Sequence, residues 1–462
     1  MNKEKRLIKN TLIYAIGNMG SKLLTFLLIP LYTEYLSSGE YGTFDLIVNT
    51  VTLLMPLVTF QLSEGIYRYI LTENDNKKIE KYISNGILVI IRNIIIFTIV
   101  YYIFCVFAVF KNKLGIYIYF VSMCLYTLWS QIARGLKKNL QYAIAGMSVT
   151  LVTMILNILF IVKFSIGING LIYSYSLGFL VGFIYLEITT KIISFIKIKN
   201  FSRKFRGRLM KYSVPLIPNA ASWWIMNVSD RYAITYLMGE AFNGIYAIAN
   251  KFPSIIVVVN SLFNLAWQES SIMEYSSEDR DEFYTNMFNN FMKLQFTSII
   301  FLLSFTKIGF SILVKGDFYL GYRTAPILYL ASIFSAFASF YGTGYLSAKD
   351  TKASLYTTML GAGVNIILNF ILIPMVGIYG AAIATLISNL LVWIVRLKHT
   401  KKYFNIKINI RAFFSLISIF IFFLGMFYID NSIMNGIMMI LSSLIFFVYN
   451  KKLLIKLINK KG

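Results

Sequence analysis

The sequence has few of the residues that build metal sites, disulfide frameworks and soluble surfaces. Its two cysteines, Cys105 and Cys124, lie in apolar runs, so it predicts no disulfide framework. Its single histidine, His399, lies in a basic segment, which argues against a zinc or haem site. Only 14% of the 462 residues are charged, whereas soluble proteins average about 25%. We therefore expect no metal and no cofactor, and the low charge excludes an ordinary soluble protein.

Apolar residues are abundant instead, at 57% of the chain. Apolar runs of about 18 residues or more recur from end to end, and each is long enough to cross a bilayer as a helix. The basic and then apolar N-terminus resembles a signal peptide, but it lacks a small-residue cleavage site and stays apolar past Pro30. We read it as a retained first helix. The sequence thus predicts an all-α polytopic membrane protein.

We predict about fourteen membrane spans, with twelve spans and a terminal helix pair as the alternative. They are expected near residues 11–33, 41–70, 83–109, 114–134, 140–162, 168–190, 212–237, 243–270, 287–314, 324–347, 353–374, 377–397, 411–429 and 432–450.

The net charge of +24 follows the predicted topology, which argues against a nucleic-acid partner. Alternate loops hold most of the 44 Lys and Arg residues: NKEKRLIK, NDNKKIEK, GLKKN, KIKNFSRKFRGRLMK, RLKHTKKYFNIK and KKLLIKLINKK. The opposite loops, such as TEYLSSGE, MGEAFN and IDNS, hold very few. The positive-inside rule then predicts that both termini are cytoplasmic and that the basic loops face anionic membrane lipids.

The two halves of the chain resemble each other. Segments 157–178 and 369–388 share an Asn that opens an apolar run and ends in GIxG, and 35–51 parallels 236–252. Six spans per half is an even number, which predicts a parallel repeat of two six-helix bundles, an architecture of alternating-access transporters. The expected parts are lobes 1–195 and 211–400, a basic linker 196–210, and an extra helix pair with a basic tail over 401–462.

Polar residues recur at spacings of three, four or seven in the helices that open each half, so they fall on one face. They predict the polar lining of a cavity; interhelical hydrogen bonding is the alternative. The lining residues are expected to be Asn18, Asn49, Thr52, Asn219, Asn227, Asn250 and Ser254. Pro56, Pro215, Pro218 and Pro253 interrupt these same helices and could act as hinges or as static bends.

Charged residues within the spans suggest what this cavity would bind. Five cations, which would attract an anion such as a phosphate group, are Lys22, Arg68, Arg92, Arg231 and Lys251. Arg68 could instead form a local salt bridge with Glu64, one turn away. Asp230 could neutralise Arg231, although adjacent residues do not face each other on a helix. Asp45, Glu64 and Asp230 are the carboxylates that could couple transport to protons or sodium.

Two segments resemble a known family. KYSVPLIPNAASWWIMNVSDRYAITYLMGEAFNGIYAIANKFPSIIVVVNSLFNLAWQES (211–270) and LSAKDTKASLYTTMLGAGVNIILNFILIPMVGIYGAAIATLIS (346–388) resemble Wzx-type O-antigen and capsule flippases of the MOP exporter superfamily. LLIPLYTEYLSSGEYGTFDL resembles them in the first half. The resemblance implies that undecaprenyl-diphosphate-linked oligosaccharide is flipped across the bacterial cytoplasmic membrane before polymerisation. Polysaccharide polymerase and chain-length proteins would be partners, and ion gradients or membrane potential would supply the energy.

Two alternative functions belong to different classes of protein, a transporter and an enzyme. A drug/ion antiporter of the same superfamily would mostly export cationic compounds, which a cavity lined by cations would repel. A membrane-embedded polysaccharide polymerase would carry a long outer loop with clustered acids, bases or metal ligands, whereas the outer loops predicted here are short. We therefore expect a transporter without catalytic residues.

Overall fold

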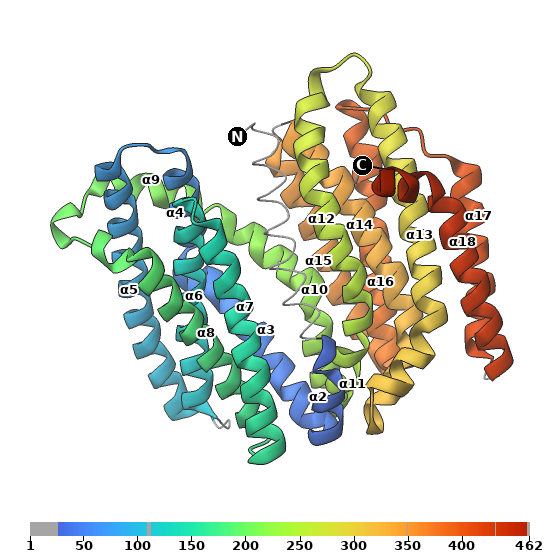
Figure 1. Cartoon of the computed structure of the whole chain (residues 1–462), viewed down its shortest axis with the longest axis horizontal. Helices are drawn as coiled ribbons and strands as arrows, with labels where there is room; N and C mark the ends of the chain where they lie inside the picture. The colour runs from blue at the N-terminus through green and yellow to red at the C-terminus, as the bar shows by residue number, and fades with distance from the viewer. Residues whose placement is uncertain (1–25, 109–111, 349, 430, 460–462) are drawn as a thin grey trace. The chain divides into compact units, whose positions relative to one another are not determined.

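A computed structural model describes residues 26–108, 112–348, 350–429 and 431–459 (Figure 1). Its long elements are all helices over these residues: α2 (Ile29–Tyr35), α3 (Ser38–Thr59), α4 (Leu62–Thr72), α5 (Asn76–Phe107), α6 (Lys113–Gly135), α7 (Asn139–Asn157), α8 (Ile168–Thr190), α9 (Arg203–Ser213), α10 (Leu216–Met238), α11 (Glu240–Ala249), α12 (Lys251–Met273), α13 (Arg280–Leu313), α14 (Ala325–Ser347), α15 (Thr351–Val376), α16 (Ile378–His399), α17 (Ile410–Tyr428) and α18 (Ser432–Asn459).

The prediction of an all-α polytopic membrane protein is confirmed. Within the described residues, 11 helices are long and apolar enough to cross a membrane, or up to 12 if the bent pair α11–α12 is one span. Most of the first predicted span, 11–33, lies outside the described residues. The predicted span 212–237 is α10, which is not among those helices because Asn227, Asp230 and Arg231 lower its hydropathy.

Local sequence signals begin several helices. Ser37 and Glu40 form a capping box at the start of α3: the Ser37 hydroxyl accepts from the Glu40 N–H at 3.2 Å, and the Glu40 carboxylate accepts from the Ser37 N–H at 3.0 Å. Asp75 caps α5 and Asn409 caps α17 through their side chains. These caps satisfy backbone N–H groups that would otherwise lack partners at the helix start.

The chain divides into two compact units between Trp224 and Ile225, inside α10. In the first unit a continuous apolar core joins α4, α5, α6 and α9, with Ile66, Ile83, Ile132 and Leu209 among its buried residues. The segment expected as a basic linker, 196–210, belongs to this unit, since α9 packs against α4 and α5.

In the second unit α14, α15 and α16 pack together, and α13 packs against α17 and α18. Arg396 of α16 is 1% exposed and ties these helices together. Its guanidinium donates to the Ala338 carbonyl of α14 at 2.7 Å and to the hydroxyls of Thr357 and Thr358 of α15 at 3.0 and 2.9 Å. Arg396 opens the basic segment RLKHTKKYFNIK, but it lies inside α16 and is buried rather than exposed in the loop.

The internal repeat is visible in the backbone. Gly167 precedes α8 with φ 62° and ψ −140°, and Gly377 precedes α16 with φ 61° and ψ −142°. Each follows a fully buried asparagine, Asn157 or Asn369, which the sequence had paired. The interval from asparagine to glycine is two residues longer in the first copy, where a π-helix, Ile158–Lys163, accommodates the extra length.

Two of the four predicted prolines, Pro253 and Pro215, lie at interruptions between helices, whereas Pro218 lies in the first turn of α10. Pro253 has no N–H to donate to the Ala249 carbonyl, and α11 and α12 meet at this point with a bend of 45°. Pro215 separates α9 from α10. Pro56, in contrast, lies inside α3, and the break from α4 comes one turn later at Phe60 and Gln61, both with positive φ.

Candidate functional site

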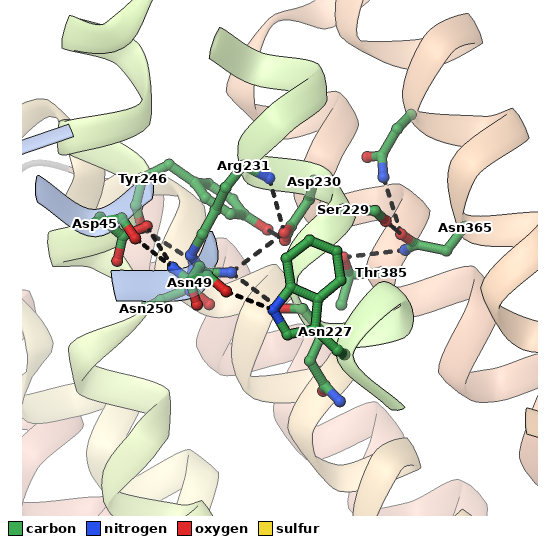
Figure 2. Close-up of polar contacts among 12 residues, drawn as sticks. Asp45, Asn49, Asn227, Ser229, Asp230, Arg231, Tyr246, Asn250, Asn365 and Thr385 are labelled. Atoms are coloured by element: carbon green, nitrogen blue, oxygen red, sulfur yellow. Dashed lines mark hydrogen bonds and ion pairs between the residues drawn. The ribbon is translucent and has the colours of Figure 1, made fainter. Parts of the chain in front are cut away.

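In the first unit, Asp45, Asn49 and Thr52 form a half-buried polar stripe along α3. The Asn49 amide donates to the Asp45 carbonyl at 2.7 Å and to its carboxylate at 3.1 Å (Figure 2). The Thr52 hydroxyl donates to the Asn49 carbonyl at 2.8 Å, and so does the Trp224 indole, also at 2.8 Å. Much of the stripe's hydrogen-bonding capacity is therefore used along its own helix.

In the second unit, Asp230 of α10 lies at the centre of a polar cluster (Figure 2). Its side chain is buried, and the Tyr246 hydroxyl donates to it at 2.6 Å. The Arg231 guanidinium lies 3.2 Å from the same carboxylate and donates to the Asn227 carbonyl at 2.9 Å. A carboxylate removed from water needs such partners to remain charged.

The contact between Asp230 and Arg231 supports the alternative that Asp230 pairs with Arg231, although adjacent residues do not face each other on a helix. The arginine side chain is long enough to fold back along the helix, and its backbone N–H also donates to Asp230, at 2.9 Å. Its guanidinium lies 6.0 Å from the Tyr246 ring centroid, within cation–π range. Asn250, at the bend between α11 and α12, donates to the Tyr246 carbonyl at 3.0 Å and extends the cluster.

A second polar cluster of this unit was missed by sequence reasoning. Asn365 and Asn369 of α15 are completely buried. The Asn365 carbonyl oxygen accepts from the Ser229 hydroxyl at 2.7 Å and from the Asn369 amide at 2.9 Å, and the Asn365 amide lies 3.4 Å from the Thr385 hydroxyl. The spacing of four between the two asparagines was the available signal, because amides within a membrane span are costly unless they are paired.

Glu64 of α4 has a different partner from the one expected. The Gln131 amide of α6 donates to its carboxylate at 2.7 Å, and Arg134 donates to Gln131 at 2.9 Å. The Arg134 guanidinium also lies 4.7 Å from the Tyr67 ring centroid. Arg68 is exposed and, within the described part of the chain, forms no ion pair with Glu64. Glu64 thus belongs to a chain of polar contacts between α4 and α6.

Arg92 of α5 is placed apart from the α3 stripe. It is exposed and donates to the side chain of its neighbour Asn93 at 2.9 Å. Ile95, Ile96 and Ile99, which follow it on the same helical face, are also exposed. An exposed apolar face of this kind is typical of contact with lipid, where a long arginine side chain can reach the headgroups.

The remaining predicted residues are scattered. Lys251 is the half-buried first residue of α12, and its carbonyl accepts from the exposed Ser254 at 2.5 Å. Asn219 is half-buried near the start of α10. Lys22 and Asn18 lie outside the described residues. The residues brought together in the second unit are therefore Asn227, Asp230, Arg231 and Asn250, with Tyr246 added by the structure.

Residues 7–268 match the family described as polysaccharide biosynthesis protein. This chain belongs to that family. Two curated relatives come from Methanocaldococcus jannaschii, and both are described only as uncharacterized membrane proteins. MJ1375 is 24% identical over 411 residues, which covers 84% of this chain and 96% of the relative. MJ1068 is 23% identical over 433 residues, which covers 85% of this chain and 84% of the relative.

Solved structures show the fold of this family member. The lipid II flippase MurJ in its inward closed conformation has a TM-score of 0.72 at 17% identity and covers 97% of this chain and all of its own. An inward-facing multidrug resistance MATE family transporter of the MOP superfamily has a TM-score of 0.69 at 14% identity and covers 87% of this chain and 99% of its own. The protein is thus a multi-pass membrane protein with the MOP superfamily fold.

Proposed function

We propose that this protein is a flippase that moves undecaprenyl-diphosphate-linked oligosaccharide from the cytoplasmic to the outer leaflet of the bacterial cytoplasmic membrane. The product would feed O-antigen, capsule or a related surface polysaccharide. The family assignment supports a role in polysaccharide synthesis. The fold shared with a protein named as a lipid II flippase supports movement of a lipid-linked substrate by alternating access.

The observation that carries the proposal is the position of Arg231. Its side chain is 14% exposed, and its helix, α10, comes between the candidate span α8 and the bent pair α11–α12 in the sequence. A guanidinium presents several N–H donors in one plane, which match the oxygens of a diphosphate. The exposed Asn227 lies one turn away and could hydrogen-bond a sugar. We assign phosphate binding to Arg231, with Lys251 as a second cation of the same unit.

We further propose that Asp230 contributes to energy coupling, by proton or sodium binding or in response to membrane potential. A buried carboxylate that shares contacts with an arginine and a tyrosine hydroxyl is sensitive to any ion that changes its charge. Asp45 and Glu64 are further candidates in the first unit, and both are already engaged in contacts with side-chain amides.

The alternative is a drug/ion antiporter, since a multidrug transporter shares the fold. Arg231 and Lys251 disfavour it, because they would repel the cationic compounds that such antiporters mostly export. The two functions differ in the charge of the cargo, and that difference can be measured.

The test is leaflet accessibility of lipid-linked oligosaccharide in proteoliposomes, with and without the protein, under an imposed ion gradient and potential. We expect protein-dependent exposure of the oligosaccharide on the opposite leaflet and no transport of cationic dyes. Dye transport without oligosaccharide exposure would replace the flippase by the antiporter.

A further inference from the structure

The exposed face of α9 is strongly cationic. Four of its basic residues are exposed and surround the exposed Gly207: Arg203, Lys204, Arg208 and Lys211. The helix, RKFRGRLMKYS, contains no acidic residue. At 100° per residue these four side chains and the glycine share one side of the helix, so their charges add at a single surface.

The opposite face of α9 is fixed in the first unit. Leu209 is 1% exposed and Ser213 is fully buried. Gly65 of α4 makes this packing possible, because a Cβ there would lie 2.1 Å from the Ser213 hydroxyl. Leu209 also approaches Gly86 of α5, where a Cβ would lie 3.6 Å from its side chain, an ordinary packing distance. The helix therefore has one apolar side in the protein and one cationic side at the surface, from which Arg208 also donates to the Tyr82 hydroxyl of α5 at 3.4 Å.

The segment before α9 is held just as firmly. Two fully buried side chains of α5 bind its backbone. The Ser84 hydroxyl donates to the Phe195 carbonyl at 2.6 Å, and the Asn85 amide donates to the Asn200 carbonyl at 3.0 Å while accepting from the Ser202 N–H at 2.8 Å. The connection from α8 to α10 is thus a docked platform of the first unit.

The depth of α9 follows from its contact with α5. From Gly86, which Leu209 approaches, α5 continues to Phe107, a length of about 30 Å at 1.5 Å per residue. That length equals the hydrocarbon thickness of a bilayer, so α9 lies at the level of one membrane surface when Phe107 lies at the other. Phe201 and Tyr212 flank its cations and are 46% and 38% exposed, as expected for aromatic residues at a membrane interface.

We propose that the cationic face of α9 binds the headgroup phosphates of anionic phospholipids, on the side that the positive-inside rule predicts to be cytoplasmic. Glu80, an acid of α5, is already held by Lys197 at 2.9 Å. A Cβ at Gly207 would meet nothing within 4 Å, so packing does not require glycine there. The bare backbone leaves room for a phosphate among four cations. This inference does not depend on the cargo of the protein.

The test compares spin-labelled phosphatidylglycerol with spin-labelled phosphatidylcholine bound to the full-length protein in bilayers. One variant carries Arg203→Gln, Lys204→Gln, Arg208→Gln and Lys211→Gln. A matched control neutralises four other exposed cations, Lys398, Lys401, Lys407 and Arg411, to glutamine. Each cation near an anionic surface contributes up to about fivefold to association. We expect the preference for phosphatidylglycerol to fall by about fivefold or more in the α9 variant and by much less in the control.

A second variant, Gly207→Leu, keeps every charge and fills the open position. It should lower the preference about twofold or more while leaving thermal stability unchanged or higher, because leucine favours helix over glycine. If the α9 and control variants lose the same preference for phosphatidylglycerol, the effect depends on net charge alone and the proposal is overturned. An unchanged preference in both the fourfold α9 variant and Gly207→Leu would also overturn it, and would leave a soluble acidic partner as the occupant of this face.

Discussion

Replacing Asn85 with alanine should release the segment that leads into α9. This asparagine is fully buried, and its amide donates to the Asn200 carbonyl at 3.0 Å and to the Lys81 carbonyl at 2.7 Å. Its carbonyl oxygen accepts from the Ser202 N–H at 2.8 Å. One side chain therefore holds two backbone groups of a segment more than 100 positions away in the sequence.

The magnitude follows from those two backbone contacts. Each buried backbone group that loses its partner costs about 1–3 kcal/mol, less where water can replace the bond. Since Asn200 and Ser202 are half-buried, we expect about 2–3 kcal/mol in the free energy of local opening. That corresponds to an open population about 30- to 150-fold larger.

Limited trypsin digestion of the full-length protein measures this population, because cleavage of a transiently open segment follows its equilibrium when reclosing is fast. The segment offers Lys199, Arg203 and Lys204 as cleavage sites. A matched control is Asn93→Ala, which removes a buried asparagine of the same helix that binds the Val58 carbonyl at 2.9 Å. Unchanged cleavage in Asn85→Ala, or equal acceleration in Asn93→Ala, would refute the docking of this segment.

Three further substitutions test other parts of the structure. The hydrogen bond from Tyr403, together with the Ala353 N–H and Lys402, holds the pKa of Asp350 below its usual value. The Asp350 carboxylate therefore contributes stability above about pH 4, and this contribution is lost as pH falls through the folded pKa. Asp350→Asn should lower the melting temperature at pH 7, and the difference from wild type should vanish in acid. Tyr246→Phe should cost about 1.5–3 kcal/mol of stability in chemical denaturation, because Asp230 loses a donor. Gly377→Ala should cost about 1–3 kcal/mol at its positive φ, measured the same way.

Composition and periodicity were sufficient for the architecture. Hydropathy and residue spacing predict the membrane class, most helix positions and the polar stripe of α3. These features can be predicted because they depend only on residues close together in the sequence. The repeat was also readable, because the Asn and GIxG pattern marks the same buried asparagine and positive-φ glycine in both copies.

Contacts between distant segments were not readable from one sequence. The partners of Arg396 could not be predicted because its acceptors, including Ala338 and Thr357, lie about 40 to 60 positions earlier. The docking of the predicted linker, 196–210, could not be predicted because Asn85, which binds its backbone, is remote in the sequence. The pairing of Arg231 with Asp230 stayed an open alternative for another reason. Helix geometry describes where a side chain starts, whereas a long side chain can fold back along the helix.

The account depends most on Arg231 as the group that binds the diphosphate. The decisive measurement is the rate of oligosaccharide flipping in proteoliposomes for wild type, Arg231→Ala and Arg280→Ala, at equal protein insertion. Arg280 is the matched control, since it binds only neighbouring groups such as Asp281 at the start of α13 in the described structure. The account predicts at least about a tenfold loss for Arg231→Ala, from one charge-assisted contact, and no loss for Arg280→Ala. Wild-type flipping by Arg231→Ala would contradict it.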